Sequence, residues 1–207
     1  MPLYKSITVD NYTKVLIWKI EETEKELYKG IVLTPYDQER VAGMKSEIHR
    51  KGYLSIRQLL KRMDYKASDL YYDDEGRPHL KNGNKISITH SFQFSAIIIS
   101  DKVIGIDIEK QRDKIKAIAT KFVGEEDRFV KGDVEMLTYV WCIKESLYKA
   151  YATPGISFKE HIGMLPFSRE DRSGKAWVIY NGDKHAYRVC FLNFEGFGCA
   201  YAIKNNE

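Results

Sequence analysis

The chain has 207 residues, of which 43% are hydrophobic and 30% are charged, and its formal net charge is +4. Fourteen tyrosines, nine phenylalanines and three tryptophans exclude an intrinsically disordered chain, because disordered segments contain few aromatic residues. Three cysteines without a Cys-x-x-Cys pair argue against a zinc site, and a chain of this length can bury a core without metals or disulfides.

The first half of the chain mixes helix and strand patterns. Residues 15–18 are apolar and β-prone, which predicts a strand. Thr34-Pro35 supplies an N-cap and a first-turn proline for a helix that should run to about residue 62, with a break or bend near Gly43 and Gly52. The other elements expected here are a short helix at 21–29, a turn at 73–76, and strands at 86–89 and 94–100.

The second half predicts one strand, then helices, then a strand meander. Asn181-Gly182 between two apolar runs is a strong hairpin signal. The expected elements are a strand at 103–109, helical stretches near 114–122, 125–130 and 135–152, and strands at 176–180, 186–192 and 197–203. Helices and strands in this order give an α+β class.

The sequence shows neither a signal peptide nor a membrane span. The segment MPLYKSITVDNYTK contains no apolar run, and the longest near-apolar run, residues 96–100, is far too short to cross a bilayer. We therefore expect a soluble cytoplasmic protein with no membrane partner. The mildly basic charge fits an anionic partner but is more often typical of a solvated surface.

Two carboxylates stand at strand spacing within VIGIDIEK, residues 103–110. Because alternate side chains of a strand share a face, Asp107 and Glu109 lie opposite the isoleucines. An ordinary half-exposed strand would show the same pattern. The alternative is a metal site, since two hard oxygen ligands on one face suit Mg²⁺, which takes water and phosphate oxygens as its remaining ligands. Gly105 leaves room for a close backbone approach.

The helix expected over 135–152 carries further polar side chains. At about 100° per residue, one arc is apolar and forms the core face: Met136, Val140, Ile143, Leu147 and Ala150. The opposite side holds Thr138, Trp141, Glu145, Tyr148 and Lys149. Glu145 and Lys149 have the spacing of an ordinary surface pair. Trp141 beside them indicates that protein or ligand covers this side.

Three carboxylates and a lysine are a minimal set for phosphoryl transfer. A metal neutralises charge on a diphosphate, and a third carboxylate completes the metal site or takes a proton from the nucleophile. A lysine stabilises the departing phosphate.

These motifs resemble a known family. Gly105-Ile106-Asp107-Ile108-Glu109, followed by Trp141-x-x-Lys144-Glu145-x-x-x-Lys149, resembles the paired signature of 4′-phosphopantetheinyl transferases. Each motif alone is weak, whereas both together in this order are specific. Upstream segments resemble the nucleotide-contacting elements of the family: Gly76-Arg77-Pro78, Ile88-Thr89-His90-Ser91, and a basic helix with His49-Arg50 and Arg57. The length matches the long Sfp-type group, whose single chain contains two similar halves.

The resemblance implies two similar α/β halves, a pseudo-dimer with the active site at their junction. Residues 1–101 would supply the nucleotide contacts, and residues 102–207 the metal and catalytic residues. The implied reaction moves the 4′-phosphopantetheine group of coenzyme A to a serine of an acyl, peptidyl or aryl carrier protein. It requires Mg²⁺, or Mn²⁺ in its place, and releases adenosine 3′,5′-bisphosphate. One chain would close one site, so we expect a monomer.

The resemblance also implies residue roles. Asp107, Glu109 and Glu145 would hold the metal, and Glu145 and Lys149 would be catalytic. Coenzyme A would be contacted by Arg50, Arg77, Pro78, His90, Lys144 and Lys149. Because a metal-bound carboxylate has a lowered pKa, Glu145 is either the base itself or acts through a water.

Several alternatives stay open. The basic residues Arg112, Lys114, Lys116 and Lys121 would suit an acidic carrier or simply form a solvated helix. A non-catalytic protein that binds coenzyme A or a carrier would not need all four acidic and catalytic residues. A metal-dependent nuclease typically has an acid-x-Lys step, whereas Lys110 follows Glu109 directly, so we expect no nucleic-acid partner.

Overall fold

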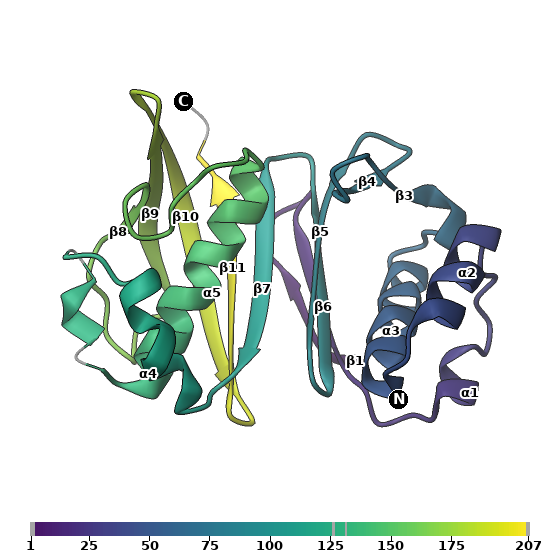
Figure 1. The fold of residues 1–207 in the computed structure, drawn as a ribbon. Helices are drawn as coiled ribbons and strands as arrows, with labels where there is room; N and C mark the ends of the chain where they lie inside the picture. The colour runs from purple at the N-terminus through teal and green to yellow at the C-terminus, as the bar shows by residue number, and fades with distance from the viewer. Residues whose placement is uncertain (1–2, 126, 131, 206–207) are drawn as a thin grey trace. The chain divides into compact units, whose positions relative to one another are not determined.

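The computed structural model describes residues 3–125, 127–130 and 132–205. The chain divides into two compact units, Met1–Asp101 and Lys102–Glu207. Each unit contains one antiparallel sheet and its own helices (Figure 1), so the expected α+β class is confirmed. No helix within the described ranges is long and apolar enough to cross a membrane.

The first unit is built on a six-stranded sheet of order β1-β2-β6-β5-β4-β3. In chain order these strands are β1 (Leu3–Thr8), β2 (Lys14–Lys19), β3 (Leu70–Tyr72), β4 (Pro78–Leu80), β5 (Lys85–Ser91) and β6 (Phe94–Ser100). One face is covered by α1 (Glu24–Leu27), α2 (Pro35–Gly43) and α3 (Glu47–Arg62), and a 3₁₀ turn, η1 (Ala67–Asp69), precedes β3 (Figure 1). Apolar side chains of β2 and β6 pack against Ile56, Leu59 and Leu60 to form the core.

The long helix expected after Thr34 is two helices. Thr34 caps α2 and shares a reciprocal capping box with Asp37, and α2 ends at Gly43, where a break was expected. The interruption that was the other possibility at Gly52 does not occur, because α3 continues through this residue. A β-carbon at Gly52 would lie 2.7 Å from the ring of His90, so this glycine lets the histidine pack against the helix.

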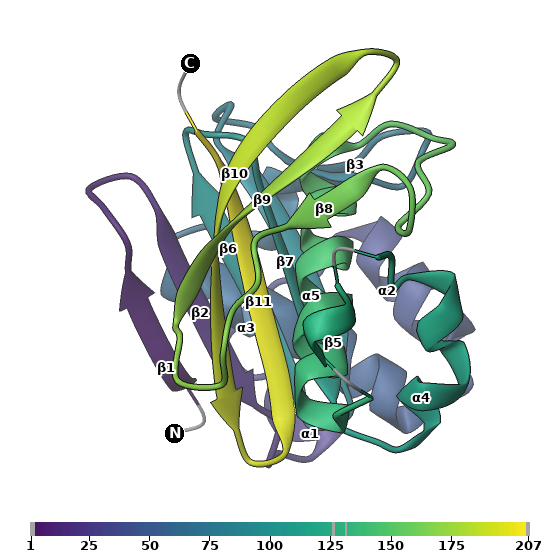
Figure 2. The ribbon, with the colours of Figure 1, turned by 90° about the vertical axis from the view of Figure 1, so that its left-hand side faces the viewer.

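The second unit is built on a five-stranded sheet of order β7-β11-β10-β9-β8. Its strands are β7 (Ile104–Lys110), β8 (Ile162–Met164), β9 (Ser173–Tyr180), β10 (Asp183–Phe194) and β11 (Phe197–Lys204). Its helices are α4 (Lys114–Ile118), the 3₁₀ turns η2 (Ala119–Lys121) and η3 (Arg128–Val130), and α5 (Val134–Tyr151). Figure 2 shows β9 and β10 as a long hairpin, and α5 contacts β7 and β11.

The strength of the local sequence signal decides which strands were predicted correctly and which were not predicted. Asn181 and Gly182 have φ values of 52° and 88°, as the predicted hairpin turn requires. The sequence reading missed β1, a mostly exposed edge strand, and β3, β4 and β8, which have only three residues each. The helix expected at 125–130 is the short η3, and position 126 lies outside the described residues.

Close packing of α5 on β7 depends on Gly105. A β-carbon there would overlap the backbone oxygen of Ser146 and lie 3.0 Å from the backbone nitrogen of Ala150. The close backbone approach expected at this glycine is therefore made by the helix itself. This close approach places the last two turns of α5 directly on β7, the strand that carries Asp107.

Gly105→Ala should therefore destabilise the protein. Backbone atoms cannot move aside as a flexible side chain can, so we expect a cost of about 1–3 kcal/mol or more. Urea unfolding measures it. Gly43→Ala is the matched control, because a β-carbon at Gly43 meets nothing within 4 Å. Equal stability of the Gly105→Ala variant and the wild type would contradict the close packing.

Candidate functional site

Strand β7 and helix α5 bring two of the predicted site residues into direct contact. The Lys149 Nζ donates hydrogen bonds to Oδ1 of Asp107 at 2.7 Å and to the backbone oxygen of Ile106 at 2.9 Å. The Asp107 residue is only 6% exposed. Lys149 is thus fixed against the strand instead of forming the surface pair with Glu145 that its spacing allowed.

The expected apolar face of α5 is confirmed, but the helix is covered on more sides than its periodicity predicts. All five residues of the expected apolar arc are buried. Thr138, expected on the opposite side, is also fully buried. Trp141 lies against Phe122 and Phe158, with ring centroids 5.1 and 5.5 Å apart, and Tyr148 lies 5.5 Å from Phe158. The expected covering of the Trp141 side is therefore provided by protein.

Glu145 lies on α5 between the aromatic residues Trp141 and Tyr148, four residues after one and three before the other. Burial raises the pKa of its carboxyl to about 7, the negative charge of Asp107 adds to the rise, Lys149 opposes it, and Glu109 adds a smaller rise. Asp107, Glu109 and Lys149 are thus close enough for their charges to act on the Glu145 carboxyl. The carboxyl of Glu145 can therefore gain or lose a proton near neutral pH.

Lys149 keeps its charge in this setting. Burial lowers the pKa of its ammonium, but the charge and hydrogen bond of Asp107 and the charge of Glu145 more than compensate, so the pKa is raised. A charged ammonium held at the edge of a carboxylate cluster can stabilise an anion that forms beside it.

Lys144 has different surroundings from those predicted. Its side chain is fully buried, and its Nζ donates to the backbone oxygens of Phe122 (2.7 Å) and Phe158 (2.8 Å) and to Oδ2 of Asp127 (2.6 Å). Three protons of an ammonium are thus engaged inside this unit. The phosphate contact predicted for Lys144 does not agree with this placement, and we assign the residue a structural position.

The donor chemistry of Asp107, Glu109 and Glu145 fits a hard divalent cation. All three offer carboxylate oxygens. Burial is the main cause of the raised Glu145 pKa, and the charges of Asp107 and Glu109 add to the rise; a cation would relieve that added repulsion. As placed, no group of three or more Asp, Glu, His or Cys side chains in the described ranges is arranged to hold a metal ion. The Lys149 ammonium takes one oxygen of Asp107, so ligation would need side-chain rearrangement.

The pH dependence of stability tests the surroundings of Glu145. Its folded pKa of about 7 exceeds the ordinary value of 4.5, so the folded protein binds this proton more tightly than the unfolded chain. The resulting stabilisation is complete below pH 4.5 and is lost as the pH rises through about 7. In EDTA, the free energy of unfolding should therefore fall with pH more in the wild type than in Glu145→Gln.

Urea unfolding at several pH values between about 4.5 and 7.5 measures this difference. Glu160→Gln, at an exposed position of the same unit, is the control for loss of a carboxylate. Parallel pH profiles of the wild type and Glu145→Gln would show that Glu145 is not shifted.

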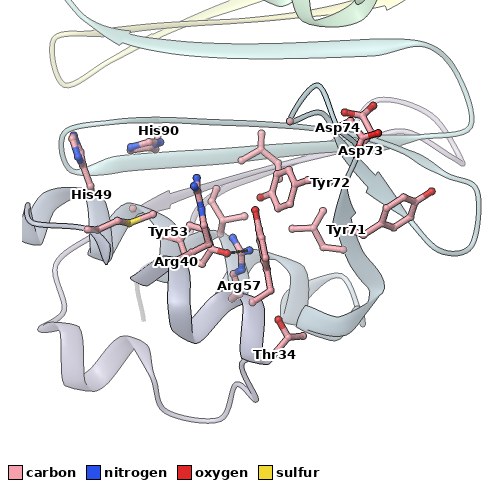
Figure 3. A pocket seen from close by; sticks show the side chains of 17 residues that line it. Thr34, Arg40, His49, Tyr53, Arg57, Tyr71, Tyr72, Asp73, Asp74 and His90 are labelled. Atoms are coloured by element: carbon pink, nitrogen blue, oxygen red, sulfur yellow. Dashed lines mark hydrogen bonds between the residues drawn. The ribbon is translucent and has the colours of Figure 1, made fainter. Parts of the chain in front are cut away.

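A cavity of about 770 Å³ lies in the first unit (Figure 3). Its wall combines basic or imidazole groups with tyrosines: Arg40, His49, Arg57, His90, Tyr36, Tyr53, Tyr71 and Tyr72. His49 and His90 stand edge to face, with ring centroids 6.1 Å apart. Gly76 also lines the cavity. Flat aromatic walls and cationic groups suit a nucleotide, and Arg40 is a lining residue that the sequence reading did not select.

The structure gives less support to the other residues predicted to contact coenzyme A. Arg50 forms an ion pair with Glu24 at 2.8 Å and donates to the backbone oxygens of Met44 and Lys45. It lines a separate hollow of about 360 Å³. Arg77 pairs with Glu75 at 2.9 Å, and Pro78 begins β4. Arg50, Arg77 and Pro78 do not line the larger cavity, whereas His90 does, together with His49, Arg57 and Gly76 from the same predicted nucleotide-contacting segments.

Arg57 is buried in the first unit and has a structural role there. Its guanidinium forms a buried ion pair with Asp37 at 2.6 Å and lies over the ring of Tyr53. The Tyr53 hydroxyl also donates to Asp37. This network joins α2 to α3 and so shapes the cavity wall.

Comparison with known proteins supports the resemblance for part of the chain. Residues 103–202 match the family model of the 4′-phosphopantetheinyl transferase superfamily. This segment contains Asp107, Glu109, Glu145 and Lys149. No curated protein matches the chain. The match supports phosphopantetheine transfer as the general type of activity.

Proposed function

We propose that the chain is an Sfp-type 4′-phosphopantetheinyl transferase. It moves the phosphopantetheine arm of coenzyme A to a serine of an acyl, peptidyl or aryl carrier protein and releases adenosine 3′,5′-bisphosphate. The observation that carries the proposal is the grouping of Asp107, Glu145 and Lys149 on β7 and α5, inside the segment that matches the superfamily.

A divalent cation, Mg²⁺ or Mn²⁺, would be held by Asp107, Glu109 and Glu145 and would supply charge neutralisation at the diphosphate. The serine oxygen forms a bond to the β-phosphorus, and the bond from this phosphorus to the bridging oxygen breaks. Glu145 receives the serine proton, directly or through a water. Lys149 stabilises the phosphate that leaves with the nucleotide, because Asp107 keeps its ammonium charged.

The first unit would bind the nucleotide. His90 and the adjoining cavity wall give the best support, since they combine imidazole, guanidinium and aromatic groups. Arg50 and Arg77 stay proposed contacts of the 3′-phosphate end, and each would have to leave its present carboxylate partner. Pro78 stays a proposed contact next to Arg77. We omit Lys144 from the phosphate contacts.

Mass measurement of an apo carrier protein tests the proposal. After incubation with coenzyme A and Mg²⁺, we expect one carrier in a panel of acyl, peptidyl and aryl types to gain the mass of one phosphopantetheine group. Binding of coenzyme A with no mass gain on any carrier would favour a non-catalytic binding protein. Metal-dependent cleavage of nucleic acid without transfer would favour a nuclease.

The chain should act as a cytoplasmic monomer. Both the proposed nucleotide contacts and the proposed catalytic residues lie on one chain, so no second subunit is needed to supply them. Light scattering should give about 24 kDa, the mass of one chain. A stable trimer whose activity falls on dilution would contradict the prediction that one chain completes one site.

A further inference from the structure

Lys144 and Asp127 form a buried ion pair in the second unit. Their side chains are 0% and 2% exposed, and Lys144 Nζ lies 2.6 Å from Oδ2 of Asp127. The same carboxylate oxygen accepts a hydrogen bond from the backbone nitrogen of Gly124 at 2.9 Å. The pair thus fixes both the Asp127 side chain and the backbone turn that precedes it.

The ammonium connects three parts of the chain. Lys144 belongs to α5, Phe122 and Asp127 belong to the segment that follows η2, and Phe158 belongs to the loop between α5 and β8. The last two parts also touch each other, because a β-carbon at Gly124 would lie 3.0 Å from the backbone oxygen of Lys159. Lys144 therefore binds both loops at the place where they contact each other next to α5.

The same two loops carry the rings that pack on Trp141 and Tyr148, the aromatic residues between which Glu145 lies on α5. Phe122 and Phe158 both contact Trp141, and Phe158 also contacts Tyr148. Each ring belongs to a residue whose backbone oxygen accepts a hydrogen bond from Lys144. The position of both rings is thus tied to the lysine next to Glu145 in the chain.

We propose that Lys144 is a positioning residue, whose ammonium fastens these two loops to α5 and so holds Phe122 and Phe158 against Trp141 and Tyr148 beside Glu145. The contacts within the second unit carry this inference. Only its consequence for turnover rests on the proposed function. A misplacement of about 1 Å at a catalytic group can cost about 10²-fold in rate, so loosened loops should lower kcat.

The test uses Asp127→Asn/Lys144→Met, which removes both charges and keeps the side-chain lengths. Neutral replacement of a buried pair is often tolerated, whereas Lys144→Met alone leaves a buried carboxylate uncompensated. By NMR, the Gly124 and Ser157 amides should exchange about tenfold faster or more, because local opening becomes easier. Amides of Phe191 and Ala200 in the sheet should not change. Nuclear Overhauser contacts from the Trp141 ring to Phe122 and Phe158 should weaken.

Turnover supplies a separate readout. We expect kcat to fall about 10²-fold and the KM for coenzyme A to stay within about twofold. Glu47→Gln/Lys51→Met removes a more exposed ion pair and should change neither the exchange nor the kinetics. If the double variant does not fold, Asp127→Asn alone gives a milder form of the same measurements, because the Lys144 ammonium keeps its two backbone acceptors and an amide oxygen.

The proposal is overturned if Gly124, Ser157 and the Trp141 contacts behave as in the wild type. It is also overturned if they change while kcat does not. If the wild type transfers nothing to any carrier, the proposed function fails, and the exchange and ring contacts alone decide whether Lys144 holds the loops.

Discussion

Asp107→Asn should lower turnover by about 10²–10³-fold or more while the protein stays folded. Asparagine keeps the shape of the side chain and can still accept the hydrogen bond from Lys149, but it loses the charge that a cation and the ammonium both need. Asp107→Ala is a less suitable variant. Asp107 is buried and paired, so alanine would leave the Lys149 ammonium without its carboxylate.

The same account predicts that EDTA abolishes transfer and that added Mg²⁺ or Mn²⁺ restores it. Initial rates of carrier modification measure both effects, and circular dichroism checks the fold of Asp107→Asn. Full activity of the wild type in EDTA, or an Asp107→Asn variant with unchanged turnover, would contradict the proposal that Asp107, Glu109 and Glu145 bind a metal ion needed for transfer.

Glu145→Gln and Lys149→Met should each lower turnover about 10²–10³-fold with little change in coenzyme A affinity. Glutamine cannot take a proton from the serine, and methionine cannot stabilise the leaving phosphate. The Lys149 variant leaves Asp107 buried without its partner, so a loss of stability should accompany the loss of rate. Glu145→Gln has no such cost and is the clearer of the two.

Single-turnover rates and calorimetric titration of coenzyme A separate these effects. Tyr148→Phe is a useful comparison, because it changes an exposed neighbour on the same helix and keeps its ring. Coenzyme A affinity that falls by the same factor as turnover would mean that Glu145 or Lys149 is a binding residue and not a catalytic one.

Short-range signals made much of the fold predictable. Thr34-Pro35 marked the start of α2, and Asn181-Gly182 marked the β9–β10 turn, because capping and left-handed turns depend on only a few neighbouring residues. The edge strand β1 could not be recognised in this way. Its sequence, LYKSIT, is largely exposed, and hydrogen bonding to β2, not an apolar pattern, makes it a strand.

The candidate site was predictable in composition but less so in contacts. The sequence predicted that Asp107 and Glu109 lie on a strand and Glu145 and Lys149 on a helix, because the period of each element can be read from sequence, and β7 and α5 confirm both elements. The surroundings of Lys144 could not be read, since its partners Phe122, Asp127 and Phe158 come from loops whose path depends on tertiary packing. For the same reason the sequence did not show that Lys149 would turn to Asp107.

Carrier modification by the wild type and Glu145→Gln, followed side by side by mass spectrometry, tests the central claim most directly. With coenzyme A and Mg²⁺, the wild type should add one phosphopantetheine group to a single serine and release one adenosine 3′,5′-bisphosphate. Glu145→Gln should bind coenzyme A equally well and leave the carrier almost unmodified. A wild type that binds coenzyme A but modifies no carrier, or a Glu145→Gln variant that modifies it at the same rate, would contradict the account.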